Sequence, residues 1–151
     1  MDTWRIQRPY TEEIMTPKIL LNYLGGMTFE NTHSITGVQI LSDVPVDETT
    51  QGKGYLPGEM LVAALASWAG STVALYGLKN SLDLMGMAVE GTLDHDEKSN
   101  ITKITITFTM PPLSYSEKDK KVMVKYAHVC PVGKMLVEGL KEFIFIWPDS
   151  E

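Results

Sequence analysis

One uncharged stretch constrains the fold more than any other part of the chain. Residues 57–78 read PGEMLVAALASWAGSTVALYGL, with no charged side chain between Glu59 and Lys79. Pro57 suits the first position of a helix, because a helix start leaves its first N–H groups unpaired. Glu59 falls in the first turn, where the helix dipole favours a negative charge. The stretch therefore predicts a long helix that is apolar on every face.

A helix of this kind is either enclosed by other elements or crosses a membrane. The stretch is about as long as a membrane span needs to be, at roughly 20 residues. However, serine, threonine, tyrosine and glycine dilute it, and no cluster of Lys or Arg flanks it to set an orientation. We therefore expect a buried helix of a soluble protein, covered by a sheet or by a partner subunit, and no membrane partner.

Charge, cysteine and histidine content narrow the classes of function. The 151 residues suit one domain, and a net charge of −6 argues against nucleic acid as a partner. The first residues lack the apolar core of a signal peptide, so we expect a cytoplasmic location. A single cysteine, Cys130, excludes an internal disulfide and fits a reducing compartment. The histidines (His33, His95 and His128) share no ligand spacing with Cys130, so we expect no metal and no cofactor.

Short apolar runs on both sides of the central helix predict strands. Three of them precede it, behind a polar arm at residues 1–18, and suggest an antiparallel meander. Two follow it around a polar turn at 94–100, and the second alternates apolar residues with threonines, which predicts a hairpin. The predicted strands are 19–24, 27–31, 38–41, 84–93 and 104–109.

A second helix is predicted after this hairpin. Ser114 and Ser116 are equally good N-cap residues, since each is followed by an acidic residue three positions later. Pro131 interrupts the helix, a further turn follows, and Gly139 closes it. Residues 141–147 predict a final strand, rich in aromatic and β-branched residues. Strands and helices segregated in this way predict an α+β fold.

Two motifs, in order and with a hairpin between them, resemble one known family. Residues 57–79 are similar to the central helix of the OsmC/Ohr family of thiol peroxidases, which typically reads P-x-E-L-L-x-A-A-L-x-x-C. Residues 130–134, CPVGK, resemble the family segment C-P-V-x-[RK]. The resemblance runs from about Leu20 to Ile146. It implies one OsmC-like domain over 1–151, with curved antiparallel sheets wrapped around two central helices in an intertwined homodimer.

The chemistry that the resemblance implies needs two cysteines. A thiolate attacks the O–O bond of a peroxide, and the resulting sulfenic acid condenses with a second thiol. The position of the first cysteine is held here by Trp68, and that of the catalytic glutamate by Gly58. The only two arginines, Arg5 and Arg8, precede the first predicted strand. Cys130 alone matches the family pattern, so the sequence leaves open whether the protein is an enzyme.

Two functions therefore remain. The first is a diverged family member that binds a small apolar or acyl-type ligand in a cleft between subunits, lined by Trp68, Ala64, Ser71 and Thr72, because an indole offers a broad apolar face and one donor. The alternative is a one-cysteine peroxidase that reduces organic hydroperoxides through Cys130, with an external thiol. A third interpretation has Trp68 plugging the site without a ligand, and Cys130 as a small buried residue.

Overall fold

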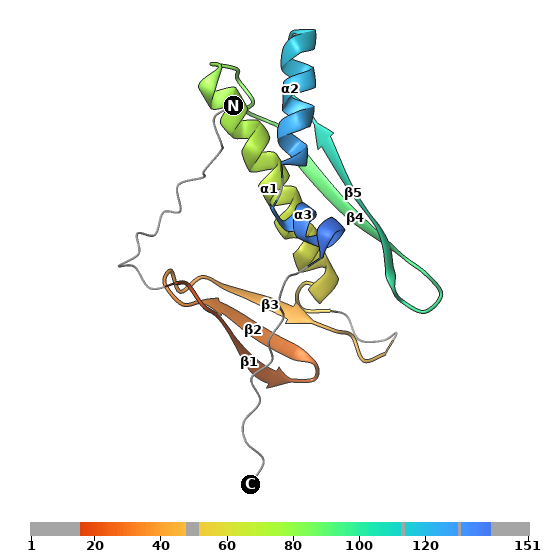
Figure 1. Ribbon diagram of the computed structural model, residues 1–151. Coiled ribbons are helices and arrows are strands. Elements are labelled where there is room, and N and C mark those ends of the chain that lie inside the picture. The colour runs from red at the N-terminus through yellow and green to blue at the C-terminus, as the bar shows by residue number, and fades with distance from the viewer. Residues whose placement is uncertain (1–15, 48–51, 113, 130, 140–151) are drawn as a thin grey trace. The chain divides into compact units, whose positions relative to one another are not determined.

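The computed structural model describes residues 16–47, 52–112, 114–129 and 131–139. They fall into two compact units, which divide between Pro57 and Gly58. We call the described residues up to Pro57 unit 1, and those from Gly58 onward unit 2. Three strands are followed by a long helix, two strands and two further helices (Figure 1). The antiparallel sheets and separate helices confirm the predicted α+β class.

Unit 1 is the predicted antiparallel meander. Its strands are β1 (Ile19–Gly25), β2 (Thr28–His33) and β3 (Gln39–Asp43), in the order β1-β2-β3. The turn between β1 and β2 passes through Gly25 and Gly26, whose φ angles are 91° and 57°. Glycine adopts this left-handed region at little cost, which is why the chain can reverse there.

The buried side chains of unit 1 are polar, and they hold the loop that follows β3. Asp43 is only 4% exposed. Its carboxylate accepts a hydrogen bond from the backbone N–H of Lys53 at 2.7 Å and another from the Thr28 hydroxyl at 2.9 Å. These bonds lower the pKa of Asp43, with the Lys53 N–H as the largest cause. Asp43 therefore fastens the loop leading to the long helix onto β3.

Unit 1 leaves its large apolar side chains exposed. On β1, residues 19, 20, 21, 23 and 24 are each between 48% and 62% exposed. Side chains of successive strand residues point to opposite faces, so both faces of this strand are apolar and open. A three-stranded sheet that buries polar residues and exposes apolar ones has no core of its own within the described residues.

Unit 2 contains the predicted central helix, α1 (Pro57–Lys79), and the predicted hairpin, β4 (Ala88–His95) and β5 (Ile101–Thr109). The first strand of the hairpin begins four residues later than predicted, because a turn stands before it. Gly86 has a φ of 90°, and the N–H of Met87 bonds to the carbonyl of Leu84.

Two shorter helices complete the described part of unit 2. They are α2 (Glu117–His128) and α3 (Pro131–Glu138), so the predicted interruption at Pro131 is confirmed. Ser116 is the N-cap of α2: its Oγ accepts the N–H of Asp119 at 3.1 Å. The predicted strand at 141–147 and most of the predicted arm at 1–18 lie outside the described residues.

One side of α1 carries the core of unit 2. Val73 and Tyr76 pack with Met123 of α2, and partly buried residues of β5 and its flanks close the cluster. β4 lies close to the helix at Gly91, where a Cβ would come within 2.3 Å of Val62. On its other side α1 exposes small residues, including Ala63, Ala64, Ser67 and Ser71. Within the described residues, α1 is therefore not covered on every side. By length and composition alone, this helix could cross a membrane.

Candidate functional site

Trp68 joins α1 to the segment that carries the second sequence motif. Its side chain is half-buried, and Nε1–H donates a hydrogen bond to the carbonyl oxygen of Val129 at 2.9 Å. Val129 directly precedes Cys130, which itself lies outside the described residues. The structure thus brings Trp68 together with Val129, the residue before the CPVGK motif, although 61 residues separate them.

Thr72 makes a second link one turn along the same side of α1. It is buried, and its Oγ1 lies 2.8 Å from the carbonyl oxygens of both Ala69 and Tyr126. The hydroxyl has one proton, so it donates a hydrogen bond to one of these two carbonyl oxygens at a time. Because residues four apart share a helix face, Thr72 and Trp68 together hold the carboxyl end of α2 against α1.

The other two residues of the predicted ligand site point elsewhere. Ala64 and Ser71 are both exposed. Ser71 lines a shallow groove of about 490 Å³, formed by small residues of α1 and two residues of β4 (Ala63, Ala66, Ser67, Gly70, Ser71, Ala74, Met87 and Val89). The four residues of the predicted site therefore do not surround one cavity within the described chain.

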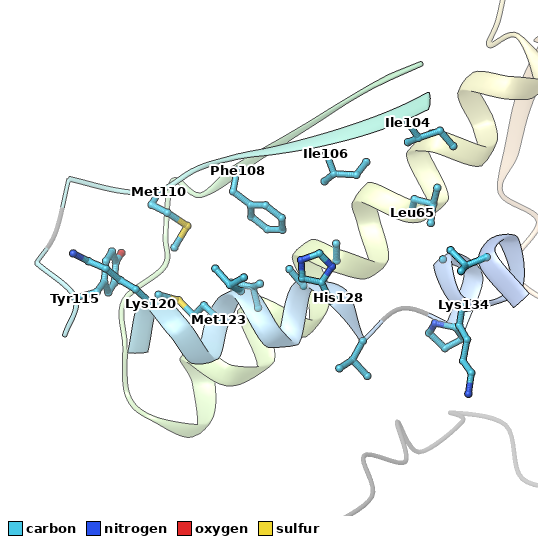
Figure 2. Close-up of a pocket in the computed structure, with 18 of the residues that line it drawn as sticks. Leu65, Ile104, Ile106, Phe108, Met110, Tyr115, Lys120, Met123, His128 and Lys134 are labelled. Atoms are coloured by element: carbon cyan, nitrogen blue, oxygen red, sulfur yellow. The ribbon is translucent and has the colours of Figure 1, made fainter. Parts of the chain in front are cut away.

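A larger cavity lies between α1, β5, α2 and α3, with a volume of about 1160 Å³ (Figure 2). Its lining is mainly apolar. Figure 2 shows Phe108 and Met110 directed from the β5 side toward α2, with Leu65 on α1. The apolar lining residues are Leu65, Ala69, Val73, Ile104, Ile106, Phe108, Met110, Pro111, Met123, Val124, Ala127, Val129, Pro131 and Val137.

The sequence predicted part of the lining of this cavity but not the cavity itself. The alternation at Ile104, Ile106 and Phe108 predicted one apolar face of a strand, and all three line it. Local periodicity indicates which face is apolar, but it does not indicate whether two apolar faces touch or stand apart. That separation depends on how α2 packs on α1.

Several polar side chains border the cavity. Lys120 and Lys134 each have an acidic partner on their own helix: Lys120 Nζ is 2.7 Å from Glu117 Oε1, and Lys134 Nζ is 3.7 Å from Glu138 Oε2. His128 also lines the cavity, and no hydrogen bond joins its side chain to another described residue. In the described chain, no group of three or more His, Cys, Asp and Glu side chains could hold a metal ion.

A separate hydrogen-bonded network fixes the amino end of α2. The Tyr76 hydroxyl donates to Asp119 Oδ1 at 2.7 Å, and the Ser116 hydroxyl donates to Oδ2. The Ser116 hydrogen bond, followed by that of Tyr76, lowers the pKa of Asp119. The same Asp119 hydrogen bond raises the pKa of Tyr76, because a phenolate would face a carboxylate. An ionised Asp119 thus ties α2 to α1.

Comparison with solved structures finds the same fold in several proteins. A protein of Psychrobacter arcticus 273-4, named for osmotic stress induction and detoxification, has a TM-score of 0.70 at 24% identity, over 83% of this chain and 90% of that one. An OsmC-like protein of Mycoplasma pneumoniae has a TM-score of 0.65 at 16% identity, over 82% and 88%. The organic hydroperoxide resistance protein OhrB of Bacillus subtilis has a TM-score of 0.57 at 19% identity, over 80% and 89%.

Sequence comparison gives the family directly. No curated protein matches the chain significantly. The family model described as OsmC-like protein matches residues 50–141, which include α1, the β4–β5 hairpin, α2 and α3. This match covers more than half of the chain, and the solved structures above share its fold. The chain therefore belongs to the OsmC-like protein family.

Proposed function

We propose that this protein binds a small apolar or acyl-type ligand and has diverged from thiol peroxidase chemistry. The observation that carries the proposal is the cavity of about 1160 Å³ between α1, β5, α2 and α3. Ligand pockets in proteins usually measure about 300–1,000 Å³ and are mainly apolar with a few polar groups. Burying apolar ligand surface there stabilises the complex by roughly 25 cal/mol per Å².

The residues predicted at the ligand site have supporting roles in this proposal. Trp68 and Thr72 hold the carboxyl end of α2 in place, and α2 forms one wall of the cavity. Ala64 and Ser71 lie on the exposed side of α1, where a second copy of the chain would cover them. The cavity proposed here lies within unit 2, and the cleft between subunits expected from the sequence stays a prediction.

Loss of peroxidase activity follows from the residue at position 68. An indole has no thiolate to attack a peroxide, and the Trp68 N–H is already engaged by Val129. We expect no turnover of cumene hydroperoxide with dithiothreitol as reductant, and none after Trp68→Cys alone, because the family's glutamate position is Gly58. Turnover by the unaltered protein that Cys130→Ser abolishes would favour the one-cysteine enzyme instead.

The protein works as a cytoplasmic homodimer in this proposal. Two surfaces support a second copy as partner: the apolar side chains that β1 exposes in unit 1, and the small-residue groove along α1 in unit 2. Small residues let another helix approach closely, and exposed apolar residues are stabilised when a partner covers them. Each surface argues for a partner independently of the other.

Ligand binding can be tested with N-phenyl-1-naphthylamine, a neutral apolar fluorophore. We expect its fluorescence to rise with the unaltered protein, and the rise to be largely lost in Ile106→Trp, because Ile106 lines the cavity. Thr107→Trp is the matched control, since Thr107 is exposed and lies on the opposite face of β5. Circular dichroism melting checks that both variants fold.

Two results would overturn the proposal: no fluorescence change with the unaltered protein, or the same change in both variants. Native mass spectrometry of the purified protein adds a direct measurement, because a ligand that stays bound through purification appears as added mass. Its mass would also identify the class of compound.

A further inference from the structure

We propose that the ligand is a long-chain carboxylate and that His128 binds its carboxylate group. This inference rests on the proposed function, because it assumes that the cavity between α1, β5, α2 and α3 is the binding site. It adds the charge of the ligand, its orientation and a residue that selects it.

The polar lining of the cavity offers more hydrogen-bond donors than acceptors. It includes Lys120, His128 and Lys134, and a single acidic residue, Glu138. Lysine has donors only, and a histidine ring has at least one N–H donor. A ligand group that only accepts hydrogen bonds, such as a carboxylate, suits this lining better than a wholly apolar ligand does.

Among these groups, His128 is the one placed to contact the ligand. The two lysines have acidic partners on their own helices, and all four side chains of these pairs are more than half exposed. Figure 2 shows Lys120 and Lys134 at opposite ends of the cavity, with His128 between them, in the space between α2 and β5. Its side chain is exposed, and no hydrogen bond to another described residue engages its ring.

The imidazole chemistry suits a carboxylate. A histidine ring has at least one N–H donor in either protonation state, and a carboxylate oxygen is a strong acceptor. A hydrogen bond to an ionised group is stronger than one between neutral groups.

The apolar tail then lies along the rest of the cavity. From His128, Phe108 and Met110 extend along the β5 side, and Met123 faces them from α2 (Figure 2). A thioether chain adapts to flexible ligands, because methionine has no branch and three rotatable bonds. The ligand class is therefore a fatty acid, with its head at the carboxyl end of α2 and its tail toward the amino end.

Isothermal titration calorimetry with dodecanoic acid and 1-dodecanol tests this inference, since the two probes share a tail and differ in the head. We expect the unaltered protein to prefer the acid by about tenfold, the usual effect of a hydrogen bond to a charged group. His128→Leu should lose this preference and still bind the alcohol. His128→Gln should recover part of it, because its amide is a donor.

His95→Leu is the matched control, because His95 is exposed on the hairpin and does not line the cavity. It should leave both affinities unchanged. Equal affinity of the unaltered protein for the two probes, or a preference that survives His128→Leu, would overturn the role of His128 while leaving apolar binding intact. Binding of neither probe would overturn the proposed function as well, as expected if a second copy of the chain fills the cavity.

Discussion

At the scale of single residues, the proposed function depends most on Trp68. A cysteine there would supply a nucleophile, whereas Trp68 supplies a donor that holds the carbonyl of Val129. Thr72 reinforces the same contact by reaching Tyr126. The two side chains thus pack one side of α1 against the carboxyl end of α2, which forms one wall of the cavity.

Replacing the indole tests this structural role. Trp68→Phe keeps an aromatic ring but removes the N–H, so we expect the free energy of unfolding to fall by about 1 kcal/mol, the usual net value of one hydrogen bond. Urea denaturation followed by circular dichroism measures the change. Tyr23→Phe is the control, because Tyr23 is exposed in unit 1, and it should have no effect. An equal change in both variants would contradict a specific role for the Trp68 hydrogen bond.

At the scale of elements, the sequence offers two possible N-cap residues for α2, and the structure uses one of them. Ser114 and Ser116 both have an acidic residue three positions later, yet the helix begins at Glu117. Ser116 accepts the N–H of Asp119 and donates to its carboxylate, and Tyr76 of α1 holds the same carboxylate from the other side. The contact with α1 adds to this cap, because Tyr76 and Ser116 bond to the same Asp119 carboxylate.

Removing each serine should distinguish the two. We expect Ser116→Ala to lower the free energy of unfolding by about 1 kcal/mol, the usual cost of losing an N-cap, and Ser114→Ala to leave it unchanged. Urea denaturation at pH 7 measures both. Equal effects would contradict the assignment of Ser116 as the cap.

The same variant has a pH signature, because the Ser116 hydrogen bond is the largest cause of the lowered pKa of Asp119. A carboxyl with a lowered folded pKa adds stability that is present above its unfolded pKa of about 3.9 and is lost as pH falls through the folded value. Ser116→Ala brings the folded pKa closer to the unfolded one. We therefore expect a smaller stability loss between pH 5 and pH 2 than in the unaltered protein.

At the scale of the whole molecule, each unit leaves surface that the described chain does not cover. Unit 1 exposes the apolar residues of β1, and unit 2 exposes the small-residue side of α1. A helix without charge over residues 60–78 is soluble only when something shields it, and the β4–β5 hairpin with α2 shields one side. The remaining side is the physical reason for proposing a second copy.

A charge placed on that side should separate the copies. We expect the unaltered protein to sediment as a dimer in analytical ultracentrifugation, and Ser67→Arg to sediment as a monomer, because an arginine in the α1 groove would be buried without a partner. Glu97→Arg, in the exposed hairpin turn, should remain a dimer. A monomeric unaltered protein, or a dimeric Ser67→Arg variant, would argue against this interface.

Much of the architecture could be predicted from local sequence. The long helix ends within one residue of its predicted bound. The second helix is interrupted at Pro131, as predicted, because proline has no backbone N–H to continue a helix. The three strands of unit 1 and the β4–β5 hairpin also formed where apolar runs and turns predicted them, except that β4 begins four residues later. The family followed from two motifs, and the family model agrees. All of these depend on residues close together in the chain, where dihedral preferences and periodicity act.

The site depended on contacts between distant parts of the chain. The sequence by itself determined that Ile104, Ile106 and Phe108 share an apolar face, and that a tryptophan stands at position 68, where the family motif that it resembles has a cysteine. Only the tertiary structure decided that this indole bonds to Val129, and that the apolar face stands across a cavity from α2. The physical reason is that periodicity identifies which face of an element avoids water, whereas packing between elements decides whether that face is filled or left open.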